Sequence, residues 1–577
     1  MPTRARKLVA YFGMLGPGEL FASAILAALL IVLSILSVLH QRFDSDESAH
    51  LHIIWAWTRG QIQYRDVFSN NMPLFHLLFA PILGLLGERA TILYWMRFIL
   101  LPMYFVTAWC TYKIGTRLFS RRAGIWAIIG LGLYGAYRNF AFEFRADNLW
   151  TAIWLLCVVV LIHGSIDFRR TLVAGLLLGF CFAVSMKSVL LLVSLLLSAL
   201  VVFAATDRRK IDISWRNFAH TTVFLGATLL PPGAIMIFFA LKGVWRDFRY
   251  GVFDYNLLAE HVYQNEVVYE SDRTYAVIVF LTALVAGFCV ARWIVRESRQ
   301  IDLPVRRAFI LLLCAFYLLA LHLFWPPISR TYLPIHPLAF VLGSGLLLAV
   351  SDNLAASKWS AARIFSFVPL TIFVSIAELA LLFAKPQFWK DNTKPETNLI
   401  RSVIALTNRD DPVLDCKGET VFRPRTLRSV LERIEMRQIE QGIIVDSAPE
   451  RCIETQTHVV ATLLLEKFSM RTRQFVNANY VPVGNGLSVA GKVLRPSAND
   501  LRRADFDVAI PARYAIVSDH AQVSGMLDTS PYDSPRFLVA GHHTFASASE
   551  FQQLTLLWAQ AVDRHFTPSG RNMPPEN

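Results

Sequence analysis

The chain has 577 residues, of which 54% are hydrophobic, and its mean hydropathy is +0.43. Soluble domains are less apolar and rarely gather their apolar residues into blocks, so this composition excludes an ordinary soluble protein. The net charge of +13 lies almost wholly in residues 1–384, which hold 33 Lys and Arg against 21 Asp and Glu, while residues 385–577 carry +1. This distribution leaves no soluble basic surface and argues against a nucleic-acid partner.

Apolar stretches long enough to span a membrane recur along the first two thirds of the chain. A bilayer core of ~30 Å requires ~20 apolar helical residues, and eleven stretches approach this length: 20–39, 91–118, 123–137, 148–164, 171–186, 188–205, 219–241, 274–295, 308–325, 338–351 and 364–384. Residues 73–87 are apolar but short and contain two prolines, so we expect them to lie along the outer membrane interface instead of spanning.

Short basic turns set the expected orientation. If each stretch spans once, all of these turns fall on one side of the membrane, which should be the cytoplasm. Eleven spans then put the N-terminus in the cytoplasm and residues 386–577 outside, as in a multi-pass protein of a bacterial inner membrane. The basic residues are Arg4, Arg6, Lys7, Arg117, Arg121, Arg122, Arg169, Arg170, Arg208, Arg209, Lys210, Arg296, Arg299, Arg306 and Arg307.

The sequence therefore predicts two domains: an α-helical transmembrane domain over 1–385 and a soluble extracytoplasmic domain over 386–577. Residues 386–480 mix helical stretches with short apolar strands such as PVLDC and GIIVD, which predicts an α/β arrangement. Residues 481–577 predict strands, followed by an amphipathic helix over 548–566. Cys416 and Cys452 are the two cysteines of this outer domain, where a disulfide between them could persist.

Polar residues gather in the outer loops 40–90, 138–147, 242–272 and 326–337, whereas the spanning stretches are nearly free of charge. In the first loop, Asp44 and Glu47 have the spacing of a helix capping box. Asp46 has no such structural task, and a helix N-terminus keeps a carboxylate ionised, as a general base requires. The alternative is that all three carboxylates only cap the helix.

Cations and a further carboxylate occupy the later outer loops: Arg138, Arg145, Asp147, Lys187 and Arg330. Their structural alternatives are interfacial anchoring, an Arg145–Asp147 surface pair and a snorkelling Lys187. Taken together, carboxylates and cations at one membrane face suit a reaction in which a phosphate leaves and a hydroxyl attacks, because the phosphate needs cations and the hydroxyl needs a base.

These residues resemble the polytopic glycosyltransferases of the C-type fold, above all bacterial relatives of protein O-mannosyltransferases and lipid A aminoarabinose transferases. The resemblance covers roughly residues 20–350. The matching elements are the acidic pair Asp46-Glu47, the stretch from Gly60 to Asp66 with Tyr64, Pro73-Leu74, Arg97, Arg145-Ala146-Asp147, Lys187, and Arg330 with Tyr332 and Pro334. Where some relatives have Lys-Pro-Pro, this chain has Asn71-Met72-Pro73, so one cation is missing.

The resemblance implies an inverting transfer of a hexose or pentose from a polyprenyl-phosphate donor to a protein, lipid or glycan acceptor. It implies Asp46, Glu47 and Asp147 as catalytic residues, with Asp46 as the base. Donor phosphate would contact Lys187, Arg145, Arg330 and Arg138, and substrate would contact Tyr64, Asp66, His50 and Tyr332. No cofactor is firmly implied; a divalent cation on Asp46 and Asp147 stays open. The alternatives are a lipid-linked glycan polymerase or ligase, and a non-enzymatic lipid or sugar transporter.

Overall fold

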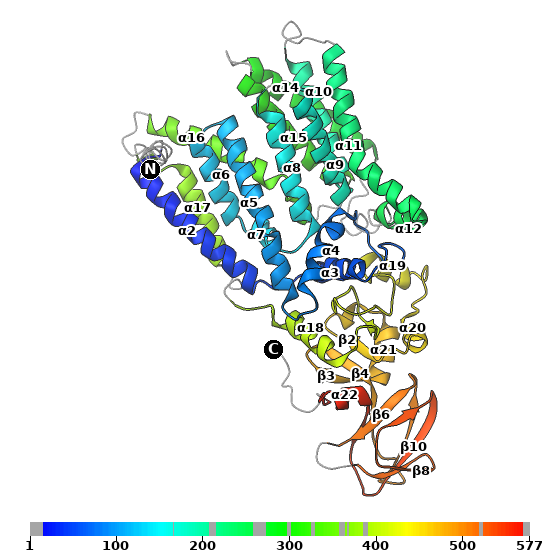
Figure 1. The fold of residues 1–577 in the computed structure, drawn as a ribbon. Coiled ribbons are helices and arrows are strands. Elements are labelled where there is room, and N and C mark those ends of the chain that lie inside the picture. Colours follow the sequence, from blue (N-terminus) through cyan, green and yellow to red (C-terminus); the bar gives the residue numbers. More distant parts are fainter. Residues whose placement is uncertain are drawn as a thin grey trace. The chain divides into compact units, whose positions relative to one another are not determined.

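The computed structural model describes residues 15–164, 167–206, 215–257, 273–296, 302–324, 329–356, 364–365, 368–384, 390–518 and 523–568 (Figure 1). The chain forms two compact units. The helical unit contains residues 1–41, 70–75 and 94–391, and the sheet unit contains 42–69, 76–93 and 392–577. The C-terminal part of the sheet unit begins at residue 392, whereas the sequence predicts a domain boundary at 385/386, and segments 42–69 and 76–93 belong to the same unit as the C-terminal residues.

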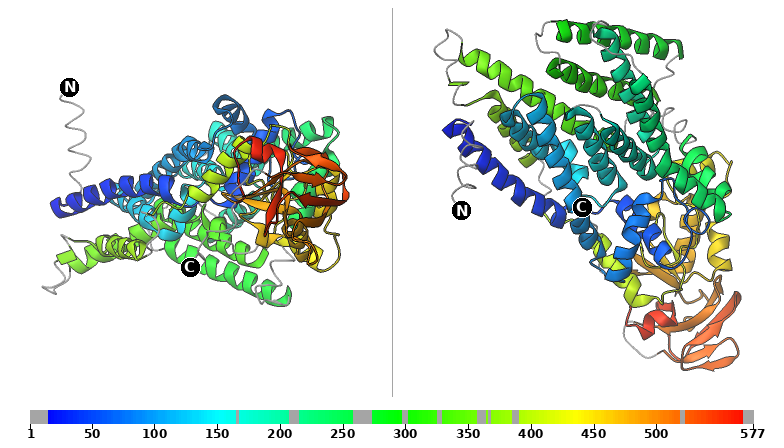
Figure 2. Two further views of the ribbon diagram at one scale, coloured as in Figure 1. Left: turned by 90° about the horizontal axis from the view of Figure 1, so that it is seen from below. Right: turned by 45° about the horizontal axis from the view of Figure 1, so that its top comes forward.

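A helix is present in every one of the eleven predicted stretches. The helices of this unit are α2 (Pro17–His40), α5 (Ile92–Leu118), α6 (Arg121–Leu133), α7 (Gly135–Ala141), α8 (Ala146–Ile162), α9 (Phe168–Val184), α10 (Ser188–Ala205), α11 (Trp215–Leu241), α12 (Trp245–Arg249), η2 (Tyr250–Asp254), α14 (Arg273–Arg296), α15 (Asp302–Phe324), η3 (Ser329–Tyr332), α16 (His336–Ala355) and α17 (Leu370–Phe383). Helices that pack against each other include α8 and α9, α9 and α11, α10 and α15, and α6 and α16; Figure 2 gives two further views of them.

Six of the described helices are long and apolar enough to cross a membrane, and the bent pair α7–α8 would make a seventh span. The chain is therefore a multi-pass integral membrane protein. Helices α6, α9, α14 and α17 cover four more predicted stretches but fall short by length or hydropathy, so the predicted total of eleven spans is not established by these criteria. The short apolar helix α4 (Leu74–Leu86) belongs to the sheet unit from His76 onward.

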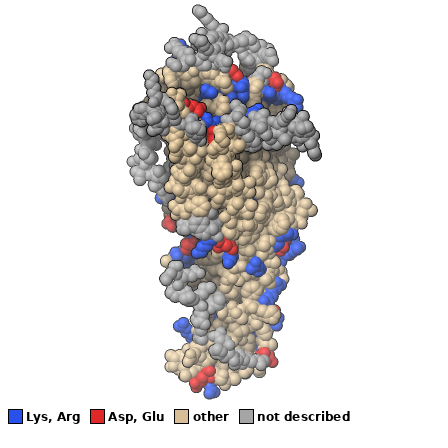
Figure 3. All heavy atoms as spheres, turned by 90° about the vertical axis from the view of Figure 1, so that its left-hand side faces the viewer, with Lys and Arg blue, Asp and Glu red and all other residues tan. Residues whose placement is uncertain are grey.

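Ion pairs connect neighbouring helices at one end of the helical unit. Arg122 at the start of α6 pairs with Glu19 at the start of α2 (2.7 Å) and with Asp352 at the end of α16 (2.9 Å). Arg117 at the end of α5 pairs with Asp302 at the start of α15 (2.7 Å). The basic turns within these described helices therefore share one end, as predicted, and on one face Lys and Arg gather at that end beside a broad band without charges (Figure 3). Arg4, Arg6, Lys7, Arg208, Arg209, Lys210 and Arg299 lie outside the described residues.

The opposite ends of the same helices are held by backbone contacts. Arg97 of α5 is buried and donates to the carbonyls of Val38 (3.3 Å) and Gln41 (2.8 Å), where α2 ends. Gln41 donates to the carbonyl of Asn139 in α7 (2.6 Å). Helices α9 and α11 approach closely because α9 has glycines: a Cβ on Gly179 would stand 2.6 Å from the carbonyl oxygen of Thr228.

The sheet unit begins with residues 42–69, which form α3 (Ser45–Thr58), and continues with residues 76–93, which include most of α4. Its C-terminal part contains the helices α18 (Lys394–Leu406), α19 (Arg433–Glu440), α20 (Ala448–Glu454), α21 (Met470–Asn479) and α22 (Ala559–Asp563), and the 3-10 turn η5 (Leu465–Lys467). The strands are β1 (Val413–Leu414), β2 (Val459–Ala461), β3 (Tyr480–Gly484), β4 (Leu487–Leu494), β5 (Arg503–Val508), β6 (Ala512–Val517), β7 (Gly525–Leu527), β8 (Ser530–Tyr532), β9 (Arg536–Leu538), β10 (Gly541–Ser547) and β11 (Leu554–Trp558).

Two sheets form from these strands. The larger has the order β1-β2-β4-β11-β6-β9, with β3 also paired to β4, and the smaller has the order β5-β10-β7-β8. Strands β1 and β2 are parallel and flanked by helices, whereas the later strands pair antiparallel. The predicted change from an α/β arrangement to strand-rich structure near residue 480 agrees with this topology.

Three local predictions for the outer domain are wrong. Residues 554–558, predicted as helix, form the central strand β11, and all five of its residues are buried. Such a run reads equally as strand or helix because sheets covered on both faces lose the polar alternation. The GIIVD segment forms no strand and exposes Ile443 and Val445. Cys416 and Cys452 are both free, buried thiols, and the Cys416 thiol donates to the carbonyl of Leu431 (3.3 Å), so the predicted disulfide is not formed.

Candidate functional site

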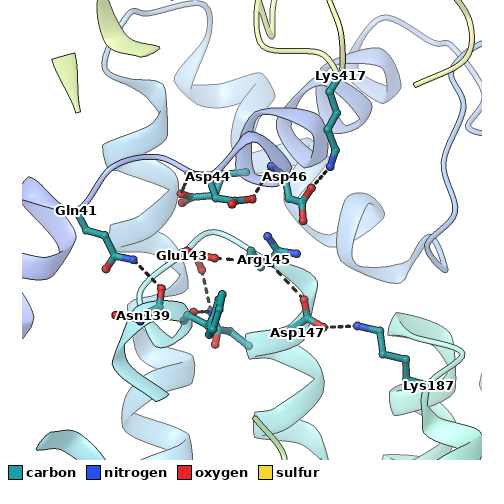
Figure 4. Close-up of polar contacts among 12 residues, drawn as sticks. Gln41, Asp44, Asp46, Asn139, Glu143, Arg145, Asp147, Lys187 and Lys417 are labelled. Atoms are coloured by element: carbon teal, nitrogen blue, oxygen red, sulfur yellow. Dashed lines mark hydrogen bonds and ion pairs between the residues drawn. The ribbon is translucent and has the colours of Figure 1, made fainter. Parts of the chain in front are cut away.

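In the helical unit, a carboxylate with two cations occupies the corner where α7 turns into α8. Helices α7 and α8 meet at 111°. Asp147, in the first turn of α8, accepts from Lys187 Nζ at 2.7 Å on one oxygen and from Arg145 Nε at 3.4 Å on the other (Figure 4). Arg145 also lies 3.7 Å from Glu143. The Arg145 and Asp147 side chains are only 5% and 8% exposed, so this is a buried charge cluster and not the surface pair of the structural alternative.

Lys187 is fixed by the helices on both sides of it. It stands at the start of α10, and its ammonium group lies 5.8 Å from the ring centre of Trp150 in α8. The Trp150 indole nitrogen donates to Ser188 Oγ (2.9 Å), and that hydroxyl donates to the carbonyl of Ser185 (2.7 Å). A snorkelling lysine would reach for solvent, whereas this side chain is 19% exposed and ends on Asp147.

The turn η3 adds a third cation to this cluster. The positive charge of Arg330 acts on Asp147 together with those of Lys187 and Arg145. Tyr317 of α15 donates to the carbonyl of Thr331 (2.7 Å), which ties η3 to the neighbouring helix. Tyr332, a predicted substrate contact, stacks on His336 with 6.2 Å between the ring centres, and its hydroxyl lies 3.3 Å from His322 Nε2. Two of the four predicted phosphate-binding cations, Lys187 and Arg145, therefore contact one carboxylate, and the charge of a third, Arg330, acts on it.

The fourth predicted cation, Arg138, has a different task. Its guanidinium group is buried and donates to the carbonyls of Gly132 (3.0 Å) and Leu33 (2.9 Å) and to the hydroxyl of Ser37 (2.7 Å). These bonds tie α7 to α2 and to the end of α6. Arg138 thus holds these helices together. Its guanidinium group is directed at these protein acceptors, which does not support the predicted contact with phosphate.

In the sheet unit, the first acidic residues adopt the predicted cap. Asp44 is the N-cap of α3 and accepts from the Asp46 amide (2.8 Å), and Glu47 accepts from the Asp44 amide (2.9 Å). Glu47 is fully buried in this box and has a structural role there, while its catalytic role stays a prediction. The Asp46 carboxylate is not used by the cap and instead forms an ion pair with Lys417 (Figure 4).

Lys417 was not predicted as a site residue. It belongs to the lysine loop, residues 415–421, between β1 and α19, and it also pairs with Glu432 at 2.8 Å. Burial lowers the pKa of Lys417, but the carboxylates of Asp46 and Glu432 outweigh this and raise it well above its usual value. Nothing in the local sequence DCKGET signals such a partner for Asp46, because the two residues are 371 positions apart.

The remaining predicted substrate residues mainly stabilise the turn after α3. Gly60 and Tyr64 have φ of +76° and +75°, and Tyr64 is buried. Asp66 accepts from the Ile62 amide (2.8 Å) and pairs with Arg65 (2.8 Å), whose hydrogen bond lowers the pKa of Asp66. The motif from Gly60 to Asp66 thus closes a turn, and the burial of Tyr64 argues against its predicted role in binding substrate.

His50, the other predicted substrate residue of this unit, lies in a buried chain of polar groups. His50 Nδ1 stands 2.9 Å from His76 Nε2, and His76 Nδ1 stands 3.0 Å from Gln63 Oε1. Burial holds the pKa of His76 well below its usual value. Within the described residues, no group of three or more His, Cys, Asp or Glu side chains is arranged to hold a metal ion.

Comparison with known proteins gives a likeness of fold. No protein-family model matches the sequence, and no curated protein is significantly similar to it. Two structures of ArnT from Cupriavidus metallidurans, one bound to undecaprenyl phosphate and one apo, match with TM-scores of 0.50 and 0.51 and identities of 13% and 11%; each covers 81% of this chain and 97% of ArnT.

A weaker match is the oligosaccharyltransferase AglB from Archaeoglobus fulgidus, in complex with an inhibitory peptide and a dolichol-phosphate. Its TM-score is 0.45 and its identity 10%, over 75% of this chain and 69% of AglB. The likeness to ArnT confirms the predicted architecture: this chain is a multi-pass helical membrane protein with the C-type glycosyltransferase fold and a C-terminal sheet domain.

Proposed function

We propose that this protein is a membrane glycosyltransferase, which moves a sugar from a polyprenyl-phosphate donor to an acceptor hydroxyl at the extracytoplasmic face. One observation carries the proposal: Lys187 and Arg145 contact buried Asp147, and the charge of Arg330 acts on it, at the helix ends opposite the basic turns. By the positive-inside rule these ends are extracytoplasmic. The fold supports the proposal, because ArnT shares it and binds undecaprenyl phosphate in its structure.

The cations suit a leaving phosphate. In the displacement, the acceptor oxygen forms a bond to the anomeric carbon while the bond from that carbon to the phosphate oxygen breaks. The lipid phosphate leaves with the electron pair, and its growing negative charge requires fixed positive groups in a dry environment. Lys187 and Arg145 are held in place before the donor arrives, since Asp147 and Glu143 neutralise and orient them.

Asp46 suits the other half of the reaction. As general base it takes the proton of the acceptor hydroxyl, so a single displacement inverts the configuration at the anomeric carbon. Its backbone amide is fixed by the Asp44 cap and its carboxylate is held by Lys417, which leaves an ionised and oriented group. Asp147, held by Lys187 and Arg145, positions the phosphate-binding groups and the sugar.

The substrates follow from the same chemistry. The donor is a hexose or pentose on a polyprenyl phosphate, and the acceptor is a protein, lipid or glycan hydroxyl reached from the cell-envelope side of a bacterial inner membrane. Purified protein incubated with a panel of polyprenyl-phosphate sugars should release polyprenyl phosphate in an acceptor-dependent manner. Absence of release across the panel and across acceptor extracts, with folded protein, would contradict the proposal.

A further inference from the structure

We propose that Lys417, from the C-terminal part of the chain, is a positioning residue for Asp46: its ammonium group holds that carboxylate ionised and aimed during transfer. This inference rests on the proposed function and assigns the C-terminal domain a direct part in the reaction. It rests on three observations: the hydrogen bonds that fix the lysine loop, the burial of the Asp46–Lys417 pair, and the carboxylate of Glu432, which shares the ammonium group.

The lysine loop is rigid because one buried carboxylate ties it together. Asp415 accepts from the amides of Gly418 (3.0 Å) and Thr420 (3.3 Å), from the Thr420 hydroxyl (2.8 Å) and from Arg425 Nε (2.6 Å). The Asp415 side chain is completely buried, and that of Arg425 is 4% exposed. A lysine carried on such a loop loses little further freedom when it forms an ion pair.

The same loop is fixed against α3. Gly418 has a φ of +97°, and a Cβ at this position would stand 2.8 Å from the Cβ of His52. The Val421 carbonyl lies 3.0 Å from His52 Nδ1. The loop therefore needs glycine to approach α3, and it meets the helix at His52 as well as at Asp46. The position of the ammonium group is therefore set by the two contacts of the loop backbone with His52 as well as by the Lys417 side chain.

The ion pair is partly dry. Lys417 is 13% exposed and Asp46 is 15% exposed. A lysine at such a depth is costly unless it is paired, and here the carboxylates of Asp46 and Glu432 share it. Together they leave a net negative charge, so Asp46 remains able to accept a proton while its direction is fixed.

The cluster is surrounded by other charged groups, which define how its protonation depends on pH. α3 and its cap contribute Asp44, Glu47, His50 and His52; α18 contributes Glu396, paired with Arg42; the lysine loop and the chain after it contribute Asp415, Glu419 and Arg425; and Glu432 precedes α19. Burial and the nearby Asp415 raise the pKa of Glu419 above its usual value.

Removal of the ammonium group should therefore change the pH dependence of transfer. In Lys417→Met, Asp46 and Glu432 lose the cation they share, and mutual repulsion favours protonation of Asp46. The acid limb of kcat/KM should move to higher pH by about 1 unit or more, and the rate at neutral pH should fall. In Glu432→Gln the Asp46–Lys417 pair stays and a negative charge is lost, so the acid limb should move to lower pH.

The experiment measures release of polyprenyl phosphate against pH for full-length protein and for Lys417→Met, Lys417→Arg, Glu432→Gln and Arg59→Met. Lys417→Arg keeps the charge and should restore the wild-type limb. Arg59→Met is the matched control, because it breaks the exposed Arg59–Asp410 pair, which joins the other end of α3 to the same domain. It should leave the limb unchanged.

The outcomes separate the two proposals. An active wild type whose acid limb is the same in Lys417→Met would overturn the inference, and so would a faster Lys417→Met, which would make the lysine an inhibitor of Asp46. If Lys417→Met does not fold, Glu432→Gln provides the test. An acid limb of kcat/KM that stays at the wild-type pH, or moves to higher pH, in Glu432→Gln would refute the inference. A wild type that transfers no sugar refutes the proposed function instead.

Discussion

Lys187→Met offers the sharpest check of the charge cluster in the helical unit. The substitution keeps the length of the side chain and removes its charge-assisted bond to Asp147, at 2.7 Å, and its stacking on Trp150. Loss of the bond costs about 1.5–3 kcal/mol, and loss of the stacking about 0.5–1 kcal/mol. Asp147 keeps its contact with Arg145 and is not left unpaired, so no further cost is added. The expected loss of folding free energy is therefore the sum of the two terms, about 2–4 kcal/mol.

The assay compares unfolding of detergent-solubilised Lys187→Met and Lys113→Met. Lys113 of α5 stacks on Trp109 at 5.6 Å in the same manner but pairs with no carboxylate within the described residues, so its loss should cost only the stacking part. The folded fraction of Lys187→Met should also require more polyprenyl-phosphate donor at an unchanged acceptor requirement. Equal stability of the two variants would contradict a stabilising Lys187–Asp147 pair, and an unchanged donor requirement would give Lys187 a structural role only.

Three further predictions follow from other parts of the structure. Arg138→Met should destabilise the helical unit by about 3–5 kcal/mol, because it leaves buried acceptors without a donor, while the donor requirement of the folded fraction stays unchanged; a changed requirement would return Arg138 to the phosphate site. Reporter fusions after Thr206 and after Asn392 should lie in the cytoplasm and outside it, respectively, and a cytoplasmic signal from both would refute the proposed orientation. Burial disfavours the charged ring of His543, but Asp528, 3.0 Å away, outweighs this and raises the pKa of His543. The His543–Asp528 pair therefore stabilises the folded protein fully below pH about 6.5, and this stabilisation is lost as pH rises through the raised pKa. Amide exchange in β10 of the intact protein should accelerate over that interval, and His543→Gln should remove the dependence.

The helical architecture could be predicted because it follows from local pattern. Apolar length alone located a helix in every predicted stretch, and the basic turns indicated which ends meet, as the Arg122–Glu19 and Arg117–Asp302 pairs confirm. The capping box of α3 was predicted for the same reason, since Asp44 and Glu47 act within one turn. Strand β11 could not be distinguished from a helix, because its burial on both faces removes the alternation that marks a strand.

The candidate site was only partly accessible to such reasoning. Lys187, Arg145 and Asp147 were identified from their order in the chain, and the structure brings them together. Whether an arginine meets carbonyls or a ligand depends on tertiary packing, so the sequence did not reveal that Arg138 donates to the carbonyls of neighbouring helices. The pairing of Asp46 with Lys417 joins segments far apart in sequence, and no local pattern encodes it.

The most direct test of the account compares sugar transfer by Asp46→Asn and Asp44→Asn in purified full-length protein, with thermal unfolding measured in parallel. Asp46→Asn keeps the shape of the side chain and removes the base, so transfer should fall by about 10²–10⁴-fold in a folded protein. Asp44→Asn should retain nearly full transfer, because asparagine caps helices as well as aspartate does. Near-normal turnover in Asp46→Asn would contradict the central claim that Asp46 is the base of a lipid-linked sugar transfer.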